Sequence, residues 1–398
     1  MSDIAETSDV ERKLSGWGRL LWVLLPLAVL AAALAWAFAA NPLRNLDIGA
    51  PPVEGLTIER TVLDSAGLRM EVRAGGSTDM RIAQVQVDDA YWLFTQEPAG
   101  PLPRGATAWI SIAYPWVLGE AHAVRFVTDT GATFDHEIAV AVPTPRPTEA
   151  ALGGQAIIGL IVGLLPVTVG LMFYPALRGI GREGMNFLLA LTVGLLAFLL
   201  VDMTGEALEL AGEAAAMFQG PVLVVLAAAA SFLLLMAVGR WRGVPGGLQL
   251  AGFIALGIGL HNFGEGLAIG AAFASGAAGL GLFLIAGFAL HNVTEGIGIA
   301  APILKQKVPL WAFAGLAMLA GGPAVVGLWI GSLATAPQWT ALALGVGAGA
   351  ILQVIIEVGA YLTRSNAGKA GTWFTPVVIA GLIAGGVVMY VTGAVVKI

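Results

Sequence analysis

Two copies of one short motif carry the side chains of this chain that are best suited to bind a metal ion. Each copy reads His-Asn-x-x-Glu-Gly, with ligand-type residues His261, Asn262 and Glu265 in the first copy and His291, Asn292 and Glu295 in the second. Residues four positions apart share a face of an α-helix, so the His and the Glu of each copy point the same way. Imidazole and carboxylate ligands suit zinc and, less selectively, ferrous iron or manganese. The pattern therefore predicts a divalent-metal site, to which the two Asn add carbonyl oxygens.

The apolar stretch 248–302 around the two copies predicts a pair of membrane helices. The small residues Ser275-Gly276-Ala277-Ala278-Gly279 between the copies predict a tight turn that makes the two helices antiparallel. Each motif lies about 13 residues, or roughly 20 Å, from that turn, and the hydrocarbon core of a bilayer is about 30 Å thick. Both copies would therefore lie deep and at similar depth, where transporters place their substrate sites.

Composition excludes several classes of protein. The chain has 398 residues, of which 57% are hydrophobic and only 12% charged, and the mean hydropathy of +0.83 indicates a polytopic membrane protein. No cysteine is present, so disulfides and thiolate metal sites are excluded. The net charge is −6, and no basic cluster points to nucleic acid as a partner. The phosphate-binding motif Gly-x-x-x-x-Gly-Lys-Ser/Thr does not occur, which leaves no ATP-binding loop of that kind.

The N-terminal region divides into a polar segment, 1–19, and an apolar run, 20–40. The run has the length of one bilayer crossing. The sequence Ala37-Phe38-Ala39 looks like a signal-peptidase site, but the apolar part of a cleaved signal is usually only about 7–15 residues long. We therefore expect an uncleaved transmembrane anchor whose polar N-terminus is cytoplasmic.

Residues 51–147 alternate between polar or β-branched and apolar side chains, which predicts half-buried strands. The clearest strand segments are 56–62, 68–72, 82–87, 108–112 and 123–127. Six to eight short strands in this length suggest a small extracytoplasmic all-β domain, an immunoglobulin-like sandwich, which ends in a stiff linker that contains Pro143, Pro145 and Pro147. His122 and His136 could bind a metal, but structural or surface roles are the better reading for both.

From residue 151 onward the chain contains eight apolar runs, at 151–174, 185–203, 220–239, 248–272, 279–303, 308–331, 337–361 and 374–395. Positive residues follow every second run: Arg178 and Arg182, Arg240 and Arg242, Lys305 and Lys307, Arg364 and Lys369. The alternate loops carry no Lys or Arg, so these basic loops are expected to be cytoplasmic. Residues 51–147 are then outside, as is the acidic loop expected after the second run, with Glu206, Glu209 and Glu213.

Carboxylates without a basic partner remain inside the apolar runs. Glu265, Glu295 and Glu357 lie there, whereas every Lys and Arg lies outside the runs. An acidic residue at the centre of a membrane helix costs about 2.5–3.5 kcal/mol on insertion scales, so the paired glutamates need a cation, a proton or water. One interpretation is two protonated glutamates bonded to the histidines. The other is a metal site, around which Gly264, Gly266 and Gly296 let the two motif helices approach each other.

The doubled motif resembles the fourth and fifth helices of the ZIP (Zrt/Irt-like) metal transporters, and most of all their bacterial members. The resemblance covers about residues 151–398; the segment 194–207 is similar to the second helix of that family and 349–357 to the seventh. It implies an eight-helix transporter that moves zinc or a similar divalent ion toward the cytoplasm. It also implies that the metal is coordinated by the motif residues, in some members as two sites that share the glutamates.

Three features depart from the family pattern. Gly322-Pro323 stands where members often have Glu-Pro, so one main metal site is expected rather than two. The loop 239–247 is short and has no His, which argues against metal sensing there. The anchor and the domain at 51–147 are not usual family parts, so the resemblance says nothing about their role.

Four further residues are candidates for the pathway of the ion. Asp202 and Glu206 would line the outer entrance, or would only be a solvated helix end. Gln353 and Glu357 lie in the seventh run, where Glu357 is either a pathway carboxylate or a residue at the membrane boundary.

We therefore expect a multi-pass protein of the plasma or inner membrane. We expect it not to be an enzyme and to need no organic cofactor. Its expected partners are divalent metal ions and the lipid bilayer. A homodimer would be ordinary, and the ligand of the β-domain stays open. Two rival functions remain. A sensor or receptor would bind metal without moving it. An intramembrane zinc hydrolase would use the same ligands with an open water position, although His-Glu-x-x-His is absent.

Overall fold

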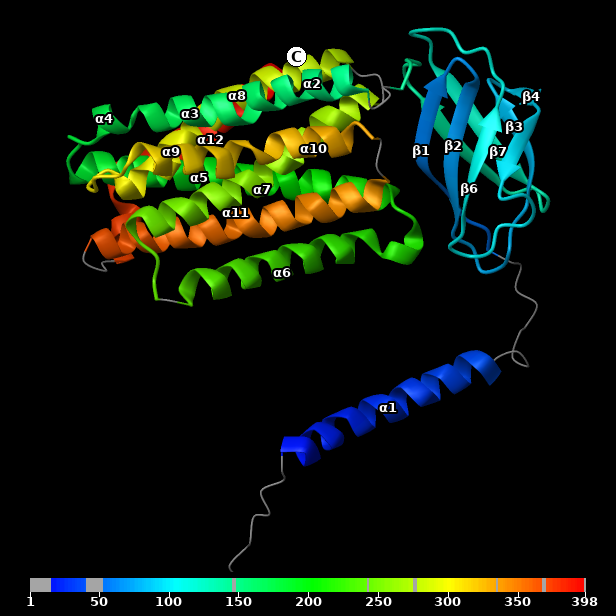
Figure 1. The fold of residues 1–398 in the computed structure, drawn as a ribbon, viewed down its shortest axis with the longest axis horizontal. Coiled ribbons are helices and arrows are strands. Elements are labelled where there is room, and N and C mark those ends of the chain that lie inside the picture. The colour runs from blue at the N-terminus through cyan, green and yellow to red at the C-terminus, as the bar shows by residue number, and fades with distance from the viewer. Residues whose placement is uncertain are drawn as a thin grey trace, which may run out of the picture. The chain divides into compact units, whose positions relative to one another are not determined.

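The computed structural model describes residues 16–40, 53–144, 148–241, 243–274, 278–333, 336–366 and 370–396. The chain divides into two compact units, residues 1–52 and 53–398 (Figure 1). The first unit contains one helix, α1 (Gly16–Ala40), which includes the predicted anchor. The predicted polar segment up to residue 15, the turn at 275–277, the linker residues Pro145 and Pro147, and Arg242 and Lys369 lie outside the described residues.

Residues 53–144 form two antiparallel sheets of four strands each. The first sheet has the order β1-β2-β6-β5 and the second the order β4-β3-β7-β8. The strands are β1 (Leu56–Asp64), β2 (Gly67–Ala74), β3 (Ile82–Val87), β4 (Ala90–Trp92), β5 (Phe94–Glu97), β6 (Thr107–Ile112), β7 (His122–Thr128) and β8 (Thr133–Ile138). All five predicted segments lie within strands. The strands β4 and β5 are short, with three and four residues, and β8 alternates but has only two apolar residues, Phe134 and Ile138.

Alternate strand residues supply the core of this β-domain. Leu68, Met70 and Val72 of β2 are fully buried, as are Ile110 of β6 and Phe126 of β7. These side chains from both sheets belong to one apolar cluster. The alternation that predicted the strands therefore also decided which faces meet.

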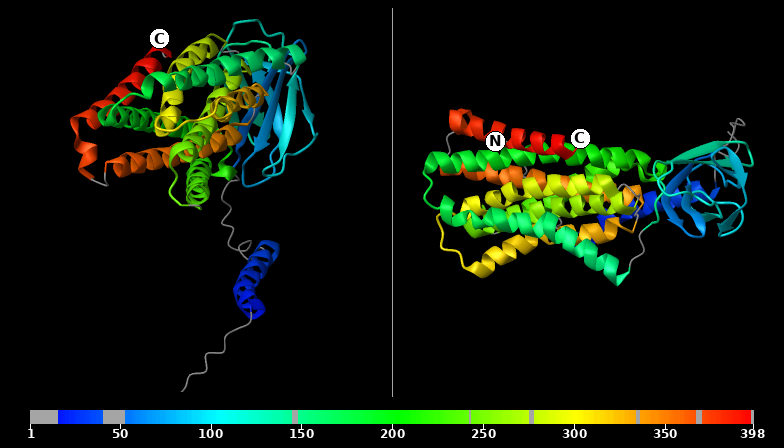
Figure 2. Two further views of the ribbon diagram at one scale, coloured as in Figure 1. Left: turned by 60° about the vertical axis from the view of Figure 1, so that its left-hand side comes forward. Right: turned by 90° about the horizontal axis from the view of Figure 1, so that it is seen from above.

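The rest of the chain is helical. Its helices are α2 (Glu149–Gly159), the π-helix η2 (Leu160–Leu164), α3 (Leu165–Met172), α4 (Tyr174–Leu177), α5 (Arg182–Glu213), η3 (Ala216–Phe218), α6 (Gly220–Arg240), α7 (Gly247–Ala274), α8 (Ala278–Ala300), η4 (Ala301–Ile303), α9 (Leu310–Gly321), α10 (Pro323–Gly331), α11 (Pro337–Ser365), η5 (Ala370–Phe374) and α12 (Pro376–Val396). Seen from above, the long helices run side by side (Figure 2, right). Six segments of the described chain are long and apolar enough to cross a membrane, which indicates a multi-pass membrane protein. They contain six of the eight predicted runs; the other two correspond to α8 and α12.

Three of the predicted runs have a different form from the one expected. The first is interrupted by η2 just before Pro166, and the sixth breaks between α9 and α10 at Pro323, because proline has no N–H for the helical hydrogen bond. The second does not end at residue 203. Helix α5 continues to Glu213, so the predicted acidic loop is helical, in keeping with the helix-forming Ala, Leu and Glu residues of that stretch.

The helices form two groups, and both motif copies lie in the first. The motif bundle contains α2, η2, α3, α7, α8, α9 and α10, and the second bundle contains α5, α6, α11 and α12. Within the motif bundle, helices touch backbone to backbone: a Cβ at Gly266 would lie 2.2 Å from the carbonyl oxygen of Ala324. Between the bundles a Cβ at Gly257 would lie 2.4 Å from Val354 Cγ2 and 3.2 Å from the carbonyl oxygen of Ala350. Close backbone packing therefore holds each bundle together, whereas the closest contact of Gly257 across the two bundles is a side chain.

Candidate metal centre

The two motif copies meet in the interior through the carboxylate of the first. Glu265 Oε1 lies 2.6 Å from His291 Nε2 of the other copy and 3.1 Å from His261 Nε2 of its own. All three residues are at least 95% buried. Among the described residues they form the single group of three His, Cys, Asp or Glu whose ligand atoms lie within 4.8 Å of one another. The i, i+4 spacing therefore brings His261 and Glu265 together on one face of α7, as predicted for the first copy. The contact of Glu265 with His291 joins α7 to α8.

Each motif Asn is oriented by a backbone carbonyl of another helix. Asn292 Nδ2 donates to Val162 O, and Asn262 Nδ2 donates to Ala320 O, both at 2.9 Å. Val162 lies four residues before Pro166, so its carbonyl lacks the usual helical donor. Ala320 lies in the last turn of α9, where helical carbonyls also lack intrahelical partners. Because the amide nitrogens are used in this way, Asn262 Oδ1 and Asn292 Oδ1 are left buried and without a hydrogen bond among the described residues.

Glu295 is the glutamate of the site whose carboxylate oxygens lack hydrogen bonds at normal distance in the described residues. Glu295 is only 2% exposed. Asn262 is a polar neighbour of its carboxylate, but in the described part of the chain neither carboxylate oxygen has a partner at hydrogen-bond distance. His261 Nε2 lies 3.9 Å from Glu295 Oε1, which is also beyond hydrogen-bond distance. A buried carboxylate in this state is strongly destabilising unless a proton or a cation compensates it. Its oxygens and those of the two Asn are atoms of the kind that could coordinate a divalent cation.

The glycines of the motif do not have the predicted role. They were expected to let the two motif helices approach each other, but they face other helices. A Cβ at Gly296 would lie 2.3 Å from Val167 O of α3, and one at Gly264 would lie 2.8 Å from Leu344 Cδ2 of α11. Gly266 faces α10. The glycines are therefore on faces of α7 and α8 other than the faces that carry His and Glu, and they pack those helices into the surrounding bundle.

Comparison with known proteins does not assign the chain to a family. No protein-family model matches the chain, and no curated protein matches it.

The predicted entrance residues lie on one helix. Asp202 and Glu206 are exposed residues of α5, one helical turn apart. Asp202, Glu265 and Glu209 are the acidic side chains whose charges reach Glu206, so the acidic end of α5 lies near the carboxylate that joins the two motif copies.

Glu357 has a partner that the sequence did not reveal. Its Oε1 accepts a hydrogen bond of 2.8 Å from Arg240 Nε, and Glu357 is fully buried. Arg240 was expected in a loop but is the last residue of α6. The pair joins residues 117 positions apart, so no local pattern could have found it. This geometry favours the membrane-boundary interpretation of Glu357, although its Oε2 and both amide atoms of Gln353 are buried without partners among the described residues.

His122 and His136 have protein partners in the β-domain. His122 Nδ1 lies 2.8 Å from Asp88 Oδ2, and His136 Nε2 lies 3.1 Å from the hydroxyl of Thr61. Burial lowers the pKa of His136. Tyr114 also donates to Asp88, and burial together with that bond raises the pKa of Tyr114 to about 12. Neither histidine belongs to a group of three ligand side chains in the described residues, which agrees with structural roles.

Proposed function

We propose that this protein carries divalent metal cations across a membrane through the site between α7 and α8. The observation that carries the proposal is the buried group of His261, Glu265 and His291, whose ligand atoms lie within 4.8 Å of one another and come from two helices. The buried Glu295 carboxylate, 3.9 Å from His261 Nε2 and without a partner at hydrogen-bond distance in the described chain, is the further ligand that we assign to the cation. The cation is the substrate, so the cost of the unpaired carboxylate would be present only while the site is empty.

The donor set favours zinc among the divalent metals. Two imidazoles and two carboxylates, with no thiolate in the chain, suit zinc and, less selectively, ferrous iron or manganese. His261, Glu265, His291 and Glu295 would hold the ion, and Asn262 and Asn292 would offer carbonyl oxygens. No organic cofactor is needed for this role.

The proposed type of carrier is a ZIP-like transporter, and the assignment rests on the doubled motif and the eight apolar segments. In this arrangement the basic loops are cytoplasmic, the N-terminus is cytoplasmic behind an anchor, and the β-domain is an extracytoplasmic immunoglobulin-like sandwich. Gly322-Pro323 provides no carboxylate beside the site, which supports one main site rather than two. Movement is inward, toward the cytoplasm.

The proposed movement is a displacement of the motif bundle against the second bundle. Backbone contacts such as Gly266 against Ala324 would keep the motif bundle rigid around its cation. The side-chain contacts between bundles, such as Gly257 against Val354, can rearrange at lower cost. Cations would arrive along Asp202 and Glu206. The gradient of the ion, the membrane potential or coupled protons would drive the movement.

Zinc uptake into proteoliposomes that contain the purified full-length protein tests this proposal. The double variant Glu265→Ala, Glu295→Ala should abolish uptake. The matched control Glu149→Ala, Glu183→Ala removes two exposed carboxylates from the first turns of α2 and α5 and should leave uptake unchanged.

The other outcomes separate the rival functions. Uptake that survives in the Glu265, Glu295 double variant would refute transport through the motif. Tight zinc binding to the wild-type protein without uptake of any divalent ion would favour a sensor. Zinc-dependent product turnover without ion flux would favour a hydrolase.

A further inference from the structure

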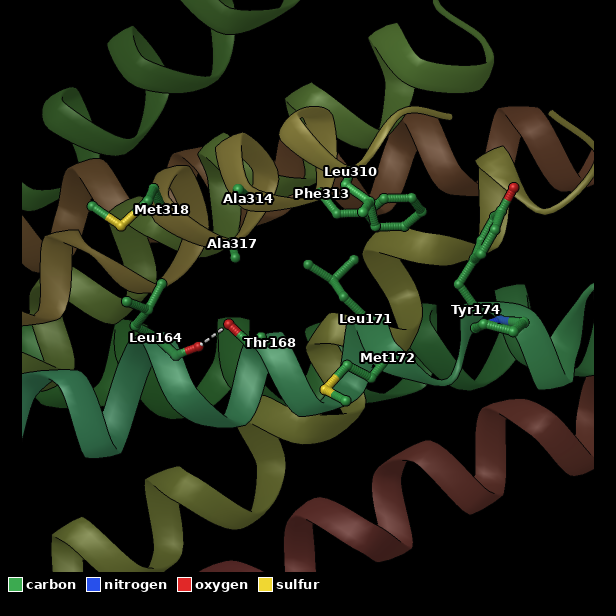
Figure 3. Close-up of a pocket in the computed structure, with 11 residues that line it drawn as sticks. Leu164, Thr168, Leu171, Met172, Tyr174, Leu310, Phe313, Ala314, Ala317 and Met318 are labelled. Atoms are coloured by element: carbon green, nitrogen blue, oxygen red, sulfur yellow. Dashed lines mark hydrogen bonds between the residues drawn. The ribbon is translucent and has the colours of Figure 1, made fainter. Parts of the chain in front are cut away.

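A pocket of about 570 Å³ lies between α3 and α9, and none of the motif residues lines it (Figure 3). Its walls are one face of each helix. Leu164, Thr168 and Leu171 come from the first helix segment, and Phe313, Ala314 and Ala317 come from α9. The Thr168 hydroxyl donates to Leu164 O at 2.7 Å and is therefore satisfied within its own helix. The pocket thus offers apolar contacts along its length and suits an apolar ligand.

The shape of the pocket follows from the way the two helix segments cross. At one end they touch, because a Cβ at Gly163 would lie only 2.3 Å from Gly321 O. At the other end the rings of Tyr174 and Phe313 meet edge to face, with centroids 4.9 Å apart. An elongated apolar space between a helix crossing and an aromatic pair has the form that a single hydrocarbon chain fills.

Positive charge is concentrated at the Tyr174 end. The Arg178 guanidinium carbon lies 5.7 Å from the centre of the Tyr174 ring. The Tyr174 hydroxyl donates to Gln306 O, and that residue stands between Lys305 and Lys307. All three basic residues are exposed, and none of them makes an ion pair with another described residue. A tyrosine beside basic residues is typical of the membrane–water interface, where an apolar ring and a polar hydroxyl are both accommodated.

We propose that this pocket binds one acyl chain of an anionic phospholipid, with the lipid phosphate held by Arg178, Lys305 and Lys307. A basic cluster beside an apolar space between transmembrane helices matches the two parts of such a lipid. A zwitterionic lipid offers the same acyl chain but no net negative charge to the three cations. The site therefore selects the lipid by its headgroup and holds it by its chain. The proposal depends on membrane insertion but not on metal transport.

Photolabelling of the purified full-length protein in detergent micelles tests the proposal. The probe is phosphatidylglycerol with a photoreactive diazirine on one acyl chain, compared with phosphatidylcholine that carries the same chain. We expect phosphatidylglycerol to label peptides of α3 and α9 at least fivefold more than phosphatidylcholine. Equal labelling of these peptides by the two lipids would refute a selective site and leave only general lipid contact.

Two variants separate the acyl-chain site from its basic rim. Ala314→Trp fills the pocket from an exposed position and should reduce the labelling of α3 and α9 at least fivefold, whereas the control Ala229→Trp, on the exposed face of α6, should not. The triple variant Arg178→Gln, Lys305→Gln, Lys307→Gln should make labelling by the two lipids equal, whereas Arg364→Gln should keep the preference. Unchanged labelling in Ala314→Trp, or a preference that survives the loss of all three rim charges, would overturn the proposal.

Discussion

The two copies of the motif share their His, Asn, Glu and Gly residues but have different electrostatic surroundings. In the first copy, Glu265 Oε1 lies 2.6 Å from His291 Nε2 and 3.1 Å from His261 Nε2, and Oε2 lies 3.3 Å from Asn292 Nδ2. In the second copy, neither oxygen of Glu295 has a hydrogen-bond partner in the described residues. The difference arises because both histidines lie closer to Glu265 than to Glu295.

A repeated motif therefore does not make a symmetric site. The protein holds one carboxylate by hydrogen bonds, and we propose that the other binds the cation. An uncompensated buried carboxylate costs several kcal/mol, which the protein would recover each time a cation binds. The proposal thus assigns different roles to two chemically identical residues, and that difference can be measured.

The largest expected effect is on zinc affinity. Glu295→Gln removes the carboxylate that the protein leaves unpaired and should weaken zinc binding about 100-fold, which corresponds to about 2.7 kcal/mol. Equilibrium titration of the purified protein with zinc measures this change. The control Glu209→Gln, on the exposed part of α5, should leave the affinity unchanged. An affinity in Glu295→Gln equal to that of the wild type would contradict the assignment.

In the metal-free protein, replacing the two glutamates should change the melting temperature in different directions. Glu265→Gln removes the acceptor of two histidines and should destabilise the metal-free protein by about 1–3 kcal/mol. Glu295→Gln replaces a buried charge that has no partner and should leave the melting temperature unchanged or raise it. The measurement is the melting temperature in the presence of a chelator. Equal decreases in both variants would show that the two carboxylates are equivalent after all.

A smaller effect should test how Asn292 is held in place. Asn292→Ala leaves Val162 O without its side-chain donor and should destabilise the protein by about 1–2 kcal/mol. Pro166→Ala supplies a backbone N–H in the helical position for that carbonyl, so the double variant should regain part of the loss. Melting temperatures of the two single variants and the double variant form the required cycle. Strict additivity would mean that Asn292 does not substitute for the missing helical donor.

The smallest expected effect is on protein stability and concerns the Asp88–His122 pair of the β-domain. This pair serves as a reference for the carboxylate–imidazole contacts of the motif. Burial opposes the ionised form of Asp88, but hydrogen bonds from the Ala123 N–H, Tyr114 and His122 outweigh it, so its pKa is lowered. A lowered pKa in the folded state stabilises the protein above the unfolded pKa of about 3.9, and this contribution is lost as the pH falls through the folded value. Because the Asp88 side chain is 41% exposed, Asp88→Asn should cost only about 0.5 kcal/mol at pH 7.

The check on this reference is its pH dependence. The difference in melting temperature between Asp88→Asn and the wild-type protein should be present at pH 7 and should shrink as the pH falls below about 4. A difference that stays constant over this range would mean that the Asp88 charge contributes nothing to stability.

The parts of the structure that depend on local order could be predicted from the sequence. The spacing of His261 and Glu265 determines that they share a helix face, and alternation such as that in 82–87 determines a strand. Both follow from backbone periodicity alone. The charge pattern likewise identified Glu265 and Glu295 as residues that need compensation, without any knowledge of their neighbours.

The parts that depend on which helices touch could not be predicted. Small residues such as Gly266 and Gly296 indicate close packing, but the sequence does not say against which helix, and the expected partner was wrong. The bond from Asn292 to Val162 spans 130 positions and exists because Pro166 removes a donor elsewhere. The asymmetry between the two glutamates is also a property of the assembled site, because each copy by itself has the same His and the same Asn.

Anomalous X-ray scattering at the zinc absorption edge, from crystals of the zinc-loaded protein, tests the central claim most directly. We predict one strong anomalous peak within about 2.0–2.2 Å of a Glu295 carboxylate oxygen and of at least one of the two motif histidines. The same peak should be absent in Glu295→Gln. A zinc peak at another place in the bundle, or one that persists unchanged in Glu295→Gln, would contradict the account.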